Sequence, residues 1–90
     1  MRALFKPSFK KDFQALEPGI ARRVKAFCLE IIPAAKSQKD LFDYGAKKLV
    51  GAKDYYRIRV GDYRIGFKID GSTVIFMRAL HRKEIYKYFP

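Results

Sequence analysis

The chain has 90 residues, and its 20 Lys and Arg against nine Asp and Glu give a formal net charge of +11. A chain of this length forms one domain, over residues 1–90, and a composition of 49% hydrophobic and 16% aromatic residues argues against disorder. So strong a positive field attracts phosphate backbones, anionic membrane surfaces or an acidic protein, and composition alone does not choose among them.

The single cysteine, Cys28, excludes an internal disulfide and argues against a metal site built on cysteines. We expect it to lie in the core. No apolar run approaches the roughly 18 residues of a membrane span, and the N-terminus lacks the apolar region of a secretory signal. We therefore expect a cytoplasmic protein with no membrane contact.

The first third of the chain predicts a short strand followed by a helical hairpin. Residues 1–6 alternate in polarity as a strand does, and Pro7 should end that strand. Ser8 has the character of an N-cap for the first helix, and Pro18 suits the first turn of the second, which Pro33 should end. The expected apolar stripes are Phe9, Phe13 and Leu16 on the first helix, and Ile20, Val24, Phe27 and Ile31 on the second.

The second half predicts an antiparallel sheet. Apolar and basic residues alternate from 55 to 69 around Gly61-Asp62, which reads as a two-residue hairpin loop. That loop would place Arg59 directly opposite Arg64, although like charges in this position are destabilising. A polyanionic ligand is the simplest reason for such a pair, and ordinary solvated arginines on an outer face are the alternative.

A third strand is expected at Val74–Leu80, after the Asp70-Gly71 turn, and its apolar residues on both faces place it centrally in the sheet. The signal from 34 to 54 is weaker, with one helical turn possible around Leu41 and Phe42. The tail from 82 to 90 is a helical turn or an ordered extension. The predicted fold is α+β, with an N-terminal strand, a helical hairpin and a three-stranded antiparallel meander that forms one small sheet covered on one face by the helices.

The chemistry available is narrow, because the sequence has one histidine, no glycine-rich phosphate loop and no pair of acids on a common predicted face. RNA, however, carries its own nucleophile, the 2′-hydroxyl. Cleavage then needs a group that takes the hydroxyl proton, a cation that stabilises the phosphate, and a group that protonates the leaving 5′-oxygen. Side chains suited to these tasks are Arg57, Arg59, Arg64, His81, Arg82 and Tyr86, with lysines around them.

Four stretches also carry a resemblance to a known family. They are Lys48-Leu49-Val50-Gly51, the run Tyr-Arg-Ile-Arg-Val-Gly-Asp-Tyr-Arg-Ile at residues 56–65, Val74-Ile75-Phe76, and His81-Arg82-Lys83-Glu84-Ile85-Tyr86. Together they resemble the RelE/ParE superfamily of toxins from bacterial and archaeal toxin–antitoxin pairs, over nearly the whole chain. In the RelE branch the resemblance implies an mRNA endonuclease that works in the ribosomal decoding site by 2′-hydroxyl attack, with no cofactor or metal ion.

The resemblance also implies roles for single residues. Arg57 and Arg59 match the basic pair on the strand before the hairpin, and Arg64 matches the arginine that stabilises the transition-state phosphate. Arg82 matches the proposed general acid and Tyr86 the proposed general base, with His81 able to replace either. Arginines stand here where RelE itself has lysines in the strand pair, and the spacing from Arg82 to Tyr86 is shorter. Further basic residues expected to bind RNA are Lys68, Arg78, Lys47, Lys48 and Lys53.

Three functions follow as hypotheses. The first is the ribosome-dependent endonuclease, which acts on mRNA and is held inactive in a hetero-oligomer by an acidic antitoxin segment that folds across the basic face. The second is a ParE-like inhibitor of DNA gyrase that cleaves nothing. The third is a silent basic module that binds RNA or DNA, with an affinity that falls steeply with salt.

Overall fold

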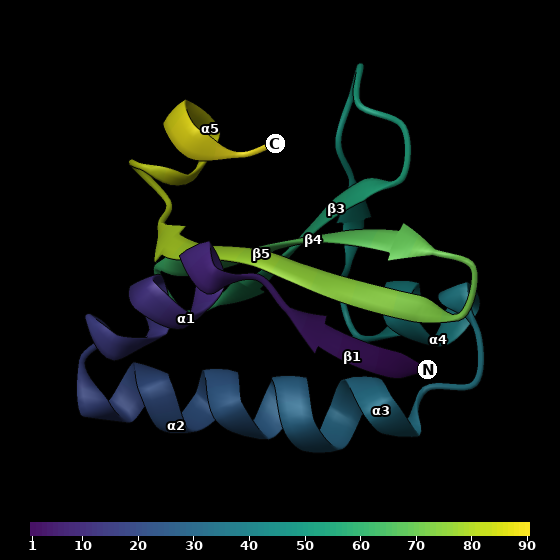
Figure 1. Ribbon diagram of the computed structural model, residues 1–90, viewed down its shortest axis with the longest axis horizontal. Helices are drawn as coiled ribbons and strands as arrows, with labels where there is room; N and C mark the ends of the chain where they lie inside the picture. The colour runs from purple at the N-terminus through teal and green to yellow at the C-terminus, as the bar shows by residue number, and fades with distance from the viewer.

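A five-stranded sheet with the order β1-β5-β4-β3-β2 organises the computed structural model, which describes residues 1–90 (Figure 1). The strands β3 (Tyr55–Val60), β4 (Tyr63–Asp70) and β5 (Thr73–His81) form the expected antiparallel meander, with β5 in the interior of the sheet. The sheet gains two edge strands beyond this meander. β1 (Arg2–Phe5) pairs in parallel with β5, and the short β2 (Lys47–Lys48) pairs with β3. The predicted α+β class is confirmed.

Most of the helical structure lies on one side of the sheet. α1 (Pro7–Gln14) packs along β5, and α2 (Pro18–Ala26) continues through a π-helical segment η1 (Phe27–Ile31) into α3 (Ile32–Ala34). Figure 1 shows this long rod along the lower side of the sheet and α5 (Ile85–Tyr88) above it. The helical turn that the sequence allowed around Leu41 and Phe42 is present as α4 (Gln38–Asp43).

The core lies between the sheet and these helices because each strand alternates. Tyr56, Ile58 and Val60 of β3 are buried, and so are Ile65, Phe67 and Ile69 of β4. Cys28 packs in the same cluster, and burial raises the pKa of its thiol to about 12, so the group stays protonated and apolar at neutral pH. The expectation of a core cysteine is confirmed.

The π-helical segment changes the apolar stripe expected for the second helix. Val24 and Phe27 are buried as predicted, but Ile31 is 38% exposed, whereas Ile32 is fully buried at 0%. An i→i+5 turn adds one residue to the helix, so every later side chain rotates relative to the α-helical pattern. The stripe therefore moves from Ile31 to Ile32, and the prediction of Ile31 was wrong.

Two predicted helix boundaries also differ. α1 begins at Pro7 with Lys6 as its N-cap, and Ser8 instead donates a 2.6 Å hydrogen bond from Oγ to the backbone oxygen of Met77. Proline suits this first position because its fixed φ fits the helix and its missing N–H would have no partner there. Pro33 lies inside α3 rather than ending the helix before it.

Candidate functional site

Arginines gather on the sheet face that points away from α1 and α2. Arg59 pairs directly with Arg64 across β3 and β4, and Arg57 pairs with Gly66, so alternation places the three side chains on one face. The Gly61-Asp62 loop is the predicted two-residue hairpin, and Gly61 has the positive φ of 59° that such a loop requires. The predicted juxtaposition of Arg59 and Arg64 is confirmed. We call Arg57, Arg59, Arg64, Arg82 and Tyr86 the arginine face.

Arg64 is the most enclosed member of the arginine face, at 8% exposed. Its Nη1 donates to the backbone oxygens of Gly61 and Tyr63, both at 3.0 Å. Nε and Nη2 make no hydrogen bond within the protein and are not fully buried, so they remain open to a ligand. Burial, followed by the charges of Arg59 and Arg57, lowers the pKa of Arg64 below its ordinary value. The guanidinium is thus held rigidly in a place that lacks compensating negative charge.

Arg57 has a buried donor with no acceptor. Its Nη1 is inaccessible to solvent and makes no hydrogen bond. The guanidinium lines a hollow of about 250 Å³ together with Lys47, Arg59 and the ring of Tyr44. A buried N–H without a partner is unfavourable, and more so on a charged group. An anion in the hollow would lie beside the side chain that carries this donor.

No carboxylate neutralises the arginine face. The protein contains two ion pairs, one between Arg78 and Asp12 and one between Lys87 and Glu84, and neither includes a member of that face. Four arginine charges are therefore left for an anion to balance. No group of three His, Cys, Asp or Glu side chains lies close enough to hold a metal ion, and no helix is both long and apolar enough to cross a bilayer.

Arg82 and Tyr86 reach the arginine face from the end of the chain. The backbone N–H of Arg82 donates to the backbone oxygen of Asp62 at 2.8 Å, which brings the end of β5 against the β3–β4 hairpin loop. After burial and the other two arginines, Tyr86 raises the pKa of Arg64 and Arg82 lowers it, so the charges of both side chains act on that guanidinium. Tyr86 is 59% exposed. The structure thus gathers five of the predicted residues at one place.

His81 lies apart from them. It pairs with Tyr63 across β4 and β5, whereas Leu80 pairs with Arg64, so alternation directs His81 to the opposite face of the sheet. Its ring meets the ring of Tyr63 edge-on at 5.5 Å, and its Nδ1 accepts a 3.2 Å hydrogen bond from the backbone N–H of Lys83. Of the three residues predicted for proton transfer, Arg82 and Tyr86 therefore lie near Arg64 and His81 does not.

Arg78 was expected to bind RNA, but its guanidinium is already hydrogen-bonded to a carboxylate of the protein. Its Nε and Nη2 donate to the two carboxylate oxygens of Asp12 at 2.7 and 3.0 Å, and its guanidinium lies 5.4 Å from the ring centre of Tyr88. The hydrogen bond to Asp12 raises the pKa of Arg78. Arg78 therefore joins α1, β5 and α5. No local pattern could reveal its partner, because Asp12 is 66 positions away.

The remaining predicted lysines divide by position. Lys47 pairs with Arg57 and shares its face, whereas Lys48 pairs with Tyr56 and points the other way. Lys68 lies with its Nζ 5.6 Å from the ring centre of Tyr55, and Lys53 is exposed in the loop before β3. Lys68 pairs with Tyr55 two positions from the pair of Arg57 and Gly66, so alternation places it on the same sheet face as Lys47 and the arginines.

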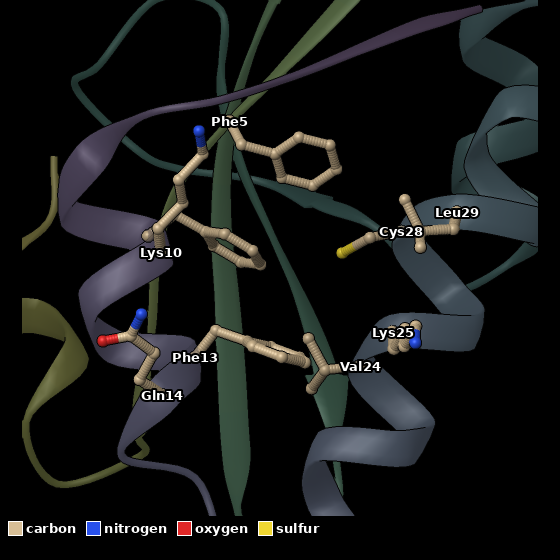
Figure 2. A pocket seen from close by; sticks show the side chains of 9 residues that line it. Phe5, Lys10, Phe13, Gln14, Val24, Lys25, Cys28 and Leu29 are labelled. Carbon is tan, nitrogen blue, oxygen red and sulfur yellow. The ribbon is translucent and has the colours of Figure 1, made fainter.

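A second hollow lies on the helix side of the sheet. Figure 2 shows the rings of Phe5 and Phe13 and the sulfur of Cys28 directed into the space between α1 and α2, with Lys10 and Gln14 extending away from it. Its volume is about 340 Å³ and its lining is mostly apolar. It contains no pair of groups suited to proton transfer, so we assign it no chemistry.

Comparisons with known proteins show the family and the fold of the chain. The family model described as the ParE toxin of the type II toxin–antitoxin system parDE matches residues 3–86. Toxin RelE3 of Methanocaldococcus jannaschii is 46% identical over 90 residues, which is 100% of both chains. A chain in the crystal structure of the RelB-RelE antitoxin-toxin complex from Methanococcus jannaschii has a TM-score of 0.78 and 41% identity, over 97% of this chain and 99% of that one. A chain of the toxin-antitoxin complex RelBE2 from Mycobacterium tuberculosis has the same fold, with a TM-score of 0.69 at 24% identity, over 90% of this chain and 96% of that one.

Proposed function

Because the chain belongs to the ParE toxin family of type II toxin–antitoxin systems, within the RelE/ParE superfamily, we propose that it is a ribosome-dependent mRNA endonuclease that needs no metal ion. The observation that carries this proposal is the arginine face itself. Arg64 is held rigidly with two nitrogen atoms left open, next to Arg59, Arg82 and Tyr86, and no carboxylate neutralises the group. A site of this kind stabilises the charge that a phosphate gains during cleavage.

In the proposed reaction the 2′-oxygen of RNA attacks the adjacent phosphorus, and the bond from phosphorus to the 5′-oxygen breaks. Arg64 donates hydrogen bonds to the phosphate oxygens, which carry more negative charge in the transition state than in the substrate. Tyr86 takes the proton of the 2′-hydroxyl, and Arg82 supplies a proton to the leaving 5′-oxygen. DNA has no 2′-hydroxyl, so the same residues leave it intact.

Arg57 and Arg59 bind the RNA backbone beside the reacting phosphate in this scheme. Arg57 lines the hollow that would receive a phosphate group, and Lys47 extends the positive surface along the same face. Each contact to a phosphate releases counterions, so binding weakens as the salt concentration rises.

We further propose that a cognate antitoxin inhibits the protein by covering the arginine face with an acidic segment. Several structural relatives are described as complexes of a RelE toxin with a RelB antitoxin. The uncompensated charge of the arginine face favours an acidic segment that becomes ordered when it binds.

The proposal is tested by adding the purified protein to a programmed translation reaction and mapping mRNA 5′ ends by primer extension. We expect cuts within the ribosomal A site that disappear with Arg64→Ala and persist with the control Arg22→Ala, since Arg22 is an exposed arginine of α2. Circular dichroism and thermal unfolding should show that Arg64→Ala remains folded. Equal cutting by a folded Arg64→Ala variant would refute the proposed site.

A parallel gyrase supercoiling assay tests the second candidate function, which the description of the matching family favours. Intact mRNA together with blocked supercoiling would identify a ParE-like inhibitor, and the arginine face would then be a binding surface for a protein. Intact mRNA with normal supercoiling, but with salt-sensitive RNA or DNA binding, would indicate a silent nucleic-acid-binding module.

A further inference from the structure

We propose that Phe89 and Gly66 form an interlock that positions Tyr86 on the arginine face, which makes both of them positioning residues for the proposed reaction. This inference rests on the proposed endonuclease function. Neither residue has a group that could take part in the chemistry, and the whole of β5 lies between them in the sequence. What connects them is a close contact on the same sheet face as Arg57 and Arg64.

Gly66 has no side chain, so it leaves the backbone of β4 uncovered on that face. It lies between Arg57 on β3 and Arg78 on β5, and a Cβ added to it would lie 2.7 Å from three ring carbons of Phe89. Contacts below 3.0 Å are essentially never seen for a real Cβ. The absence of a side chain is thus what lets the ring lie on the strand backbone.

Phe89 fills this place almost completely, at 3% exposed. Its ring meets the ring of Tyr55 edge-on at 5.7 Å, and its backbone N–H donates to the oxygen of Ile85 at 2.9 Å. Ile85 is fully buried as well, yet neither Ile85 nor Phe89 belongs to the core between the sheet and α1 and α2. The two residues form a separate, smaller apolar contact on the arginine face.

Tyr86 lies between these two buried residues in the sequence and is itself exposed. A third contact holds the same segment, because the ring of Tyr88 packs on the guanidinium of Arg78, which Asp12 holds through both carboxylate oxygens. Asp12 also accepts from the backbone N–H of Ala79, so this support is tied to β5 and α1. Contacts on both sides of Tyr86 therefore fix its backbone while its ring remains free to meet RNA.

The consequence for the proposed reaction is geometric. A misplacement of about 1 Å at a reacting group can lower a rate roughly 100-fold. Tyr86 makes no hydrogen bond within the protein that would fix its ring, so its position relative to Arg64 depends on its neighbours in the chain. Displacing Phe89 should move Tyr86 without removing any group that contacts RNA.

The test is Gly66→Ala, measured on programmed ribosomes under single-turnover conditions. We expect the cleavage rate to fall about 10- to 100-fold, while the ribosome concentration that gives half the maximal rate changes less than about twofold. The control is Lys87→Ala, on the same segment, because Lys87 is exposed and makes only a solvent-accessible ion pair with Glu84. This control should retain the wild-type rate.

A double-mutant cycle separates positioning from a purely structural role. In a Tyr86→Phe background, Gly66→Ala should cause little further loss, because the group it misplaces is already gone. Equal losses in both backgrounds would overturn the proposal and assign Gly66 and Phe89 to stability alone. If Gly66→Ala fails to fold, Phe89→Leu replaces it in the same cycle, since it keeps an apolar side chain but removes the ring.

Amide hydrogen exchange provides a readout that does not depend on activity. The N–H of Phe89, bonded to Ile85, should exchange faster in Gly66→Ala than in the wild type, while the N–H of core residues such as Phe67 should not. An unchanged exchange rate for the N–H of Phe89 would overturn the proposal that Gly66 and Phe89 position this segment. If the wild type leaves mRNA intact, the proposed function fails; if the wild type cuts and Gly66→Ala cuts equally fast, only the positioning role fails.

Discussion

The two faces of the sheet use the same strands for opposite purposes. On the helix side, Phe67 and Ile65 of β4 are completely buried in a continuous apolar core. On the other side, one residue along the same strand, Arg64 stands among like charges with no carboxylate to balance it. A strand alternates, so a single stretch of sequence can supply packing on one face and an anion site on the other. Substitutions on the helix side should therefore lower stability, and those on the arginine face should lower activity.

The largest effect is expected from Phe67→Ala, on the helix side. The fully buried ring contacts both Tyr56 and Phe76, so its removal leaves a cavity in the centre of the core. We expect the free energy of unfolding to fall by about 3–5 kcal/mol, measured by urea denaturation. Val50→Ala is the control, because Val50 is fully exposed. A loss below about 1 kcal/mol would mean that this part of the core repacks around the gap.

Arg64→Lys asks whether the arginine face needs charge alone or the geometry of a guanidinium. Lysine keeps the positive charge but cannot donate to Gly61 and Tyr63 while also presenting two donors to a phosphate. We expect the single-turnover cleavage rate to fall about 10- to 100-fold, with stability changed by less than about 1 kcal/mol. Retention of the full rate would show that a point charge at this position is sufficient.

Arg57→Gln removes one charge from the hollow beside β2. Because a phosphate contact releases counterions, the slope of log affinity against log salt concentration should become shallower by about 1 for single-stranded RNA binding. Fluorescence anisotropy across a salt series measures that slope. The matched substitution Arg22→Gln, on the exposed surface of α2, should leave it unchanged. Equal slopes for wild type and Arg57→Gln would show that Arg57 does not contact the RNA phosphates.

The smallest effect should distinguish two adjacent lysines. Lys47 shares the face of Arg57, whereas Lys48 pairs with Tyr56 and points to the helix side. We expect Lys47→Ala to weaken RNA binding about 3- to 10-fold and Lys48→Ala to change it less than about twofold. Equal losses for both variants would indicate that the positive charge acts as a diffuse field, and the contrast between the two faces would not extend to β2.

Local patterns predicted the parts of the molecule that depend on near neighbours in the sequence. Alternation over 55–69 was enough to place Arg59 opposite Arg64, because a two-residue loop leaves one register for the hairpin. The pairing of β1 with β5 and the ion pair between Asp12 and Arg78 join distant segments, and no period in the sequence marks them. The π-helical turn that buries Ile32 in place of Ile31 likewise has no propensity signature.

The residues of the candidate site likewise fall into those that local patterns predicted and those whose contacts depend on distant segments. Residue type and the strand period identified Arg57, Arg59 and Arg64, whose neighbours on the sheet follow from the hairpin. Arg78 carries the same charge and was also expected to bind RNA, yet a carboxylate from α1 occupies it. The contact of Phe89 with Gly66 depends on how the last residues fold back over β4, which a single sequence does not reveal.

The parallel pairing of β1 with β5 determines when the molecule can be completed during synthesis. Arg2 pairs with Thr73, so the first strand to be made has no partner in the sheet until the last strand appears. Contacts between such distant residues form slowly, because the intervening chain must first be closed into a loop. Arg82 and Tyr86 come later still. A nascent chain therefore lacks both a complete sheet and a complete arginine face until β5 and the segment through Tyr86 have left the ribosome that makes it.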